Sequence, residues 1–301
     1  MNVISPVTAG MTRKVAEYSF EEISSRYQEK FNINIDRFKP IGGNLILYRC
    51  LDTGYEFFEP QDVSGDNVFY QELQKFDWYY MEKKWEHIEA LKLINNGSFL
   101  EIGCAKGAFL EQLRDYKKDI KIYGQELNTS AVNECRARGF SVNSLSFSEL
   151  TEEYANKIDS IASFQVLEHV SAVSSFFKTS YALLKKDGRL VISVPNMGSF
   201  IKHNDGGVLN FPPHHVGWWD RESLKKTGKI FGFEFELVRY EPLQEYHYKW
   251  YLDNLLSRLV RNDRLRCKLF SKKIKRRLIP AVRFIAKWVK GHTILVCFRK
   301  K

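Results

Sequence analysis

From Ser98 onwards, short apolar runs alternate with helical patterns, and this alternation restricts the possible folds more than any other feature of the chain. The runs predict strands at 99–102, 120–124, 141–143, 160–165, 189–194, 234–240 and 293–299. Between most of them, the pattern predicts helices at 108–116, 129–138, 173–184 and 221–230. Strands that alternate with helices of this length predict an α/β fold, with a parallel sheet covered by helices on both faces.

The residues before Ser98 are less regular. Residues 20–31 predict a helix, residues 68–95 one or two helices, and residues 45–59 two short strands around the turn Asp52-Thr53-Gly54. We expect an N-terminal region at 1–75 and the main domain at 76–301, with a helical insert at about 245–290.

The stretch FLEIGCAKGAFLEQL (99–113) requires a tight turn between the first strand and the first helix of the alternation. Gly103 and Gly107 let the backbone turn sharply, and the helix that follows presents free N–H groups at its positive dipole end. A ligand related to a nucleotide can therefore lie over this turn. The same residues are also compatible with an ordinary turn between a strand and a helix.

Two acidic residues indicate which ligand would fit the turn. Glu101 would repel a pyrophosphate but suits a cationic group, such as the amino end of S-adenosylmethionine. The dinucleotide pattern GxGxxG is broken by Ala105 and Ala108, which argues against an NAD dehydrogenase. Glu126 ends the second predicted strand, where a carboxylate can hydrogen-bond both ribose hydroxyls; a solvated loop residue is the alternative.

The ordered motifs EIGCAKG, GQE, SFQVLEHV and LKKDGRLVISVPN resemble those of class I S-adenosylmethionine-dependent methyltransferases. They span about residues 98–196, and the likeness to the Methyltransf_23-type, UbiG-like branch continues through PPHHVGWWDRESL to GHTILVCFRK. The resemblance implies a Rossmann-like seven-stranded sheet with an antiparallel last strand. The chain departs from the family pattern at Ala105, and SLSFSEL (144–150) lacks the acid often found after the third strand.

The resemblance also implies which residues form the site. The implied cofactor-binding residues for S-adenosylmethionine are Glu101, Gly103, Cys104, Gly107, Glu126, Leu127, Phe147, Gln165 and Val166. His169, His214 and His215 are the implied catalytic candidates on the acceptor side. The aromatic-rich segment 75–87 resembles the family's N-terminal lid, although core packing explains its pattern equally well.

A histidine that titrates near neutral pH can accept a proton from a hydroxyl while that hydroxyl is methylated. The alternative is that these histidines only shape the pocket wall, with catalysis by proximity. We predict no metal site, because no third ligand has suitable spacing next to His214 and His215. Where related enzymes carry a zinc ribbon, this chain has Cys50 and Thr53, which indicates a metal-free remnant or an unrelated hairpin.

The positive charge of the chain is concentrated near its C-terminus. From Glu245 to the end there are 17 Lys and Arg residues and 3 Asp and Glu residues, whereas the rest of the chain is slightly acidic. In 245–290 the cationic residues alternate with apolar ones at helical spacing. Such helices can lie on an anionic membrane, cover the sheet, or bind nucleic acid, and we favour the first two.

Together these features predict an S-adenosylmethionine-dependent methyltransferase. We expect O-methylation of a small-molecule or glycolipid acceptor in bacterial glycan or lipopolysaccharide biosynthesis, with an RNA-modifying enzyme or a non-catalytic cofactor-binding protein as alternatives. No signal peptide or membrane span is recognisable, and the five cysteines are scattered. The expected location is the cytoplasm, with peripheral membrane contact through 245–290.

Overall fold

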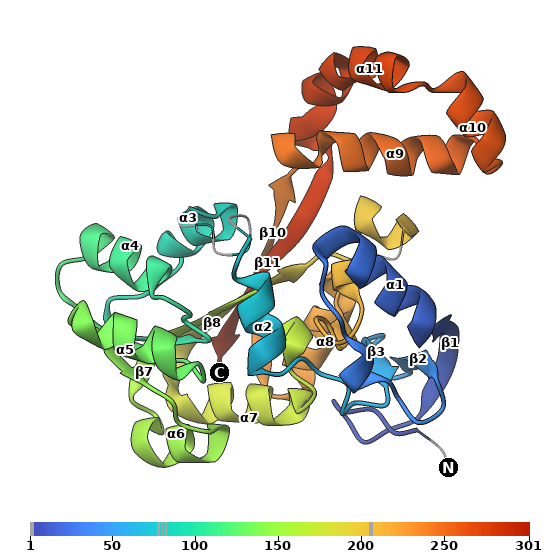
Figure 1. Cartoon of the computed structure of the whole chain (residues 1–301). Helices are drawn as coiled ribbons and strands as arrows, with labels where there is room; N and C mark the ends of the chain where they lie inside the picture. The colour runs from blue at the N-terminus through green and yellow to red at the C-terminus, as the bar shows by residue number, and fades with distance from the viewer. Residues whose placement is uncertain (1–2, 77–78, 80, 82, 205–206) are drawn as a thin grey trace.

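The computed structural model describes residues 3–76, 79, 81, 83–204 and 207–301, and its centre is a seven-stranded sheet (Figure 1). The strand order is β10-β11-β8-β7-β4-β5-β6. The strands are β4 (Gly97–Ile102), β5 (Ile120–Gln125), β6 (Ser141–Asn143), β7 (Ile158–Phe164), β8 (Leu184–Pro195), β10 (Phe233–Pro242) and β11 (Lys290–Lys300). The first five run parallel, and β11 is antiparallel to both neighbours. The predicted α/β fold with an antiparallel last strand is confirmed.

Helices cover both faces of this sheet. One face carries α3 (Trp85–Leu91), α4 (Ala108–Tyr116) and α5 (Thr129–Ala137), and the other carries α6 (Phe147–Tyr154), α7 (Val173–Leu183) and α8 (Arg221–Ile230). Neighbouring strand residues point to opposite faces, so that Phe99 packs under the first group and Leu100 under the second. Because both faces are buried, the central strands are continuous apolar runs. The sequence did not predict α6, whose helix signal is a Ser146–Glu149 capping box.

The N-terminal region forms a second, antiparallel sheet in the order β1-β2-β3-β9. Its strands are β1 (Thr12–Ser19), β2 (Asn44–Cys50), β3 (Glu56–Glu59) and β9 (Gly217–Trp218), and its helices are α1 (Phe20–Phe31) and α2 (Asn67–Leu73). The predicted hairpin and the helix at 20–31 are present. Strand β9 comes from the FPPHHVGWWD segment, so pairing with β3 fixes that segment between the two sheets.

The aromatic segment 75–87 does not form one helix. Residues 74–76 are a turn after α2, and α3 begins only at Trp85. Residues 77, 78, 80 and 82 of this segment lie outside the described residues. Helices α2 and α3 therefore agree with the prediction of one or two helices in 68–95.

The basic segment forms a separate helical lobe of α9 (Tyr248–Leu259), α10 (Asp263–Leu269) and α11 (Lys272–Ile285). Figure 1 shows this lobe, in orange and red, standing off the sheet beyond the ends of β10 and β11. Where the lobe meets the body, the rings of Trp250 and Tyr251 pack against Phe200. The Asn254 amide also donates to the Phe200 carbonyl at 3.0 Å. The lobe thus does not cover a face of the sheet. None of the described helices has the length and apolar content needed to cross a bilayer.

The packing of the two sheets predicts that Gly217 tolerates no side chain. A Cβ at this position would lie 1.9 Å from the Tyr55 hydroxyl oxygen, and Tyr55 is fully buried against Trp219 with ring centroids 4.0 Å apart. We expect Gly217→Ala to lower the free energy of unfolding by about 1–3 kcal/mol in urea denaturation. Gly42→Ala is the matched control, because a Cβ there meets nothing within 4 Å. Equal stability of the two variants would contradict this packing.

Candidate active site

The turn after β4 has the left-handed backbone that its glycines allow. Gly103 and Gly107 have φ of 74° and 76°, and a Cβ on Gly103 would lie 2.4 Å from Cγ2 of Val166. The N–H groups of Gly103 and Cys104 both donate to the Gln125 carbonyl, at 2.8 and 3.0 Å. This places the end of β5 and the residues after β7 against the turn. Gly107 is then the N-cap of α4.

Glu101 lies at the end of β4, and its carboxyl group is buried. Its Oε2 has no hydrogen-bond partner among the residues that the structure describes. Burial raises the pKa of this carboxyl well above its usual range. A buried carboxyl oxygen without a partner is costly, and a cationic ligand would relieve that cost.

Glu126 holds the turn through backbone hydrogen bonds. Its Oε2 accepts from the Ala105 N–H at 2.8 Å, and its Oε1 accepts from the Asn128 N–H at 2.8 Å. Glu126 is half-buried. The carboxylate therefore links the turn after β4 to the start of α5, and it lies at the position where the sequence predicts ribose contact.

The other predicted cofactor residues are distributed around this turn. Val166 contacts Gly103, and Cys104 is buried beside Gly124. Gln165 has a positive φ of 55° and donates from Nε2 to Glu86 and Ser193, each at 3.5 Å. Leu127 is 68% exposed.

Phe147 has a different environment from the turn residues. Its ring contacts Phe176 of α7, with ring centroids 6.1 Å apart, as part of the core. The structure therefore gives this side chain a packing role within the sheet domain.

Together the turn residues fit S-adenosylmethionine. The polar groups around the turn are a buried carboxyl group at the end of β4, backbone N–H groups at the start of α4, and the Glu126 carboxylate at the end of β5. These groups match an amino end and a ribose, because the first is cationic and the second carries two hydroxyls. The partnerless Oε2 of Glu101 is the observation that favours a cationic group.

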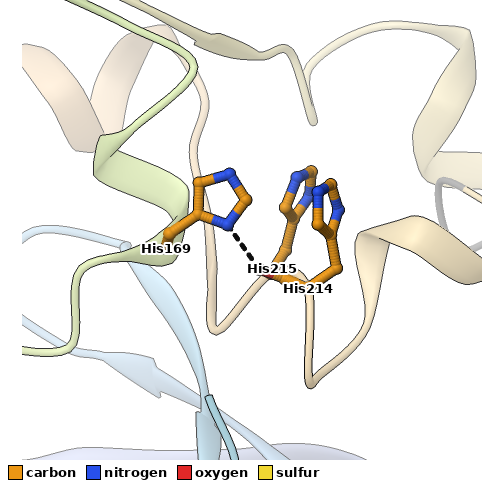
Figure 2. Close-up of side chains that lie close together, drawn as sticks. All are labelled: His169, His214 and His215. Atoms are coloured by element: carbon orange, nitrogen blue, oxygen red, sulfur yellow. Dashed lines mark hydrogen bonds between the residues drawn. The ribbon is translucent and has the colours of Figure 1, made fainter. Parts of the chain in front are cut away.

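The fold brings together three histidines that are far apart in sequence. One ring nitrogen each of His169, His214 and His215 lies within 4.8 Å of the other two. Figure 2 shows His169 facing the stacked rings of His214 and His215, whose ring centroids are 4.3 Å apart. His169 belongs to the short helix η2 (Leu167–His169) after β7, and the Val216 N–H donates to the Glu168 carbonyl at 2.9 Å. That bond joins η2 to the histidine loop.

Hydrogen bonds fix the same tautomer in all three rings. The Nδ1 of His169 donates to the His214 carbonyl (Figure 2), and the Nδ1 of His214 donates to the Leu209 carbonyl at 2.9 Å. The Nδ1 of His215 donates to Oδ1 of Asn210 at 2.9 Å. Each Nε2 is therefore left with a lone pair. Burial lowers the pKa of His169 to about 4 and those of His214 and His215 well below the usual range.

Glu168 lies beside these rings. Its Oε1 is 4.0 Å from Nε2 of His169 and 3.9 Å from Nε2 of His215. Both of its carboxyl oxygens are buried and lack a hydrogen-bond partner within the described chain. Burial raises the pKa of this carboxyl to about 8. The group is therefore a fourth polar side chain directed into the histidine cluster.

Sequence reasoning missed several residues of this region. Glu86 on α3 is buried, and burial raises the pKa of its carboxyl group. The positive charge of Lys84 opposes the rise in pKa of all three buried carboxyl groups, those of Glu86, Glu101 and Glu168. Asn210 orients His215, and its own amide donates to the Met197 sulfur at 3.0 Å. The only sequence signal for Asn210 is its position next to FPPHH.

A family model described as "Methyltransferase domain" matches residues 73–238, which is more than half of the chain. Among proteins of curated function, none matches the chain in sequence.

Solved structures of methyltransferases share the fold. An S-adenosylmethionine-dependent methyltransferase from Archaeoglobus fulgidus is 18% identical over 78% of this chain and 100% of its own, with a TM-score of 0.53. Another from Thermotoga maritima is 18% identical over 78% of this chain and 97% of its own, with a TM-score of 0.51. At this identity the similarity shows the fold alone.

Proposed function

The chain belongs to the methyltransferase domain family and is an S-adenosylmethionine-dependent methyltransferase; on that premise we propose that it methylates a hydroxyl group. The proposed acceptor is a small molecule or a lipid-linked glycan, with bacterial glycan and lipopolysaccharide intermediates as the leading class. The observation that carries the proposal is the histidine cluster with Glu168, next to the turn that suits the cofactor.

In the proposed complex, Glu101 receives the amino group of the cofactor and Glu126 its ribose. The helix start after Gly107 and the backbone N–H groups of the turn would complete the site. Val166 restricts the space above Gly103, and the exposed Leu127 can cover the adenine. The cofactor supplies a methyl group on a sulfonium, which is already a strong electrophile.

On the acceptor side, we assign catalytic roles to His169, His214 and His215. Methylation of a hydroxyl requires that its proton leaves, and three neutral rings with free Nε2 lone pairs beside a carboxyl group can bind that hydroxyl and promote the loss of its proton. The Nδ1 hydrogen bonds hold the rings in place, which favours an in-line approach of oxygen to methyl carbon.

The position of the helical lobe supports a lipid-linked acceptor. Strand β10 ends and β11 begins at the same edge of the sheet where β4 and β8 end, so the root of the lobe lies at the edge that carries the site. His292 at the start of β11 contacts His247 at the start of α9, with ring centroids 5.2 Å apart. An acceptor held at the root of the lobe would lie at the sheet edge that carries the cluster.

The surface of the lobe suits an anionic membrane. Lys273, Arg277 and Phe284 share the outer face of α11, and Trp288 extends this face, with its ring 5.9 Å from that of Phe284. Phe284 and Trp288 are 74% and 64% exposed. Exposed aromatic rings with cations around them are typical of helices that lie on anionic lipid.

A groove at the root of the lobe can accommodate a lipid headgroup. It has a volume of about 520 Å³, and its lining includes Tyr248, Arg283 and Lys287. Arg283 forms no ion pair with any residue that the structure describes. Its guanidinium is therefore available to a phosphate or pyrophosphate.

The cofactor assignment predicts a specific loss of binding in Glu101→Gln. The substitution keeps the shape of the side chain but removes the charge that would face the amino group, so affinity for S-adenosylmethionine should fall by about 1.5–3 kcal/mol. Isothermal titration calorimetry measures this loss. Glu134→Gln is the matched control, since Glu134 is an exposed carboxylate on the next helix, paired with Lys106. Unchanged affinity in Glu101→Gln would rule out the assigned role.

The acceptor assignment predicts that histidine variants lose turnover but keep cofactor binding. Alanine at His169, His214 or His215 should lower methyl transfer by about 100-fold or more while S-adenosylmethionine still binds. The assay transfers a tritiated methyl group to a panel of glycolipids, with the lipid-free glycans and tRNA in parallel. His247→Gln, at a half-buried histidine outside the cluster, is the control. Full activity in all three variants would leave catalysis to proximity, and label in tRNA alone would refute the acceptor class.

The membrane assignment predicts an effect of charge on the outer face of α11. Lys273→Glu with Arg277→Glu should weaken binding to phosphatidylglycerol vesicles at least about tenfold, since each cation near the surface contributes about 1 kcal/mol. Lys118→Glu with Lys121→Glu makes the same change in net charge at exposed positions around β5 and should have little effect. Equal vesicle flotation of the parent protein and the Lys273→Glu, Arg277→Glu variant would contradict the assignment. Preferential binding to RNA would also contradict it.

A further inference from the structure

We propose that the histidine cluster and Glu168 form a binding site for one divalent transition-metal ion such as Zn²⁺. His169, His214 and His215 each place a ring nitrogen within 4.8 Å of the other two. The sequence predicted no metal site, because no third ligand has suitable spacing next to His214 and His215; the tertiary fold places His169 beside them. The inference deepens the proposed function. The role of the cation rests on that function, but the binding of the cation does not.

The hydrogen bonds around the rings are those of metal-binding histidines. Metal-bound imidazole typically donates its second N–H to a carbonyl or carboxylate oxygen, which fixes the tautomer and the ring orientation. All three rings donate from Nδ1 to an oxygen: His169 to the His214 carbonyl, His214 to the Leu209 carbonyl, and His215 to the side chain of Asn210. The three Nε2 atoms therefore carry the lone pairs that a metal ion would need.

Glu168 provides the fourth donor. Its Oε1 lies about equally far from Nε2 of His169 and Nε2 of His215, at 4.0 and 3.9 Å. These distances are too long for hydrogen bonds, and neither carboxyl oxygen has another partner in the described part of the chain. A cation between these atoms would replace the missing interactions of a carboxyl group that is 1% exposed.

The donor set selects the class of metal. Three imidazoles and one carboxylate suit Zn²⁺, Co²⁺ or Ni²⁺ better than Mg²⁺ or Ca²⁺, which prefer sites made only of oxygen ligands. The Tyr79 hydroxyl lies 3.4 Å from Nε2 of His214 and would have to shift when that nitrogen coordinates.

The cation would act on the acceptor. A hydroxyl that binds it loses its proton to solvent more readily. Its oxygen then forms the bond to the methyl carbon, and the carbon–sulfur bond of the donor breaks with its electron pair on sulfur. The products are the methyl ether and S-adenosylhomocysteine.

The test is a Co²⁺ titration of the untagged, chelator-treated full chain, followed by visible absorption and by competition with Zn²⁺. Cys267→Ser is used as the background, because Cys267 is an exposed thiol that can bind these ions. We expect one Co²⁺ per chain, displaced by Zn²⁺. Alanine at any of the three histidines should weaken this binding at least about tenfold, and Glu168→Gln should also weaken it.

His247→Gln should bind Co²⁺ as tightly as the parent, and circular dichroism with S-adenosylmethionine binding checks that each variant is folded. Absence of stoichiometric Co²⁺ or Zn²⁺ binding by the parent protein would overturn the inference without any variant. So would unchanged binding in all three histidine variants. Methyl transfer at full rate by the cation-free enzyme would overturn the role of the cation and leave the proposed function intact. Cation binding without methyl transfer to any acceptor would confirm the binding site and overturn the proposed function, and with it the role of the cation.

Discussion

The constraint on which the site depends is the burial of three carboxyl groups at one edge of a parallel sheet. Glu86, Glu101 and Glu168 come from three separate segments, and burial raises the pKa of each. Lys84 offsets this only in part. Buried carboxyl groups destabilise a fold unless they are neutral or meet a cation. A cationic cofactor and a metal ion are the kinds of ligand that would complete such a site.

The parallel sheet explains why these groups meet. Strands β4, β5, β7 and β8 end at the same edge, so the residues that follow them are brought together although they are distant in sequence. The N-terminal sheet adds the histidine loop to this edge, because β9 pairs with β3. The helical lobe joins β10 to β11 at the same edge. Strand direction and the pairing of β9 with β3 thus bring the turn after β4, the histidine cluster and the root of the lobe to one edge.

Much of the fold could be predicted from periodicity. All seven strands of the main sheet overlap the apolar runs that predict them. The central strands have the clearest apolar runs, because they are buried on both faces. Strand β1 was missed since most of its side chains are at least partly exposed and its pattern is weak. In the site, the left-handed turn at Gly103 was predictable from local residues. The meeting of three histidines was not, because the spacing of two adjacent histidines carries no information about a third histidine 45 residues earlier.

The sequence by itself determined the turn at 103–107 and the family, since both depend on residues close together along the chain. A glycine can adopt φ near 75° whatever surrounds it, and a helix can begin after it. Only the tertiary structure decided that His169 meets His214 and His215. That meeting depends on the bond from the Val216 N–H to the Glu168 carbonyl and on the packing of two sheets. Such long-range contacts are formed by the whole core, so no local pattern encodes them.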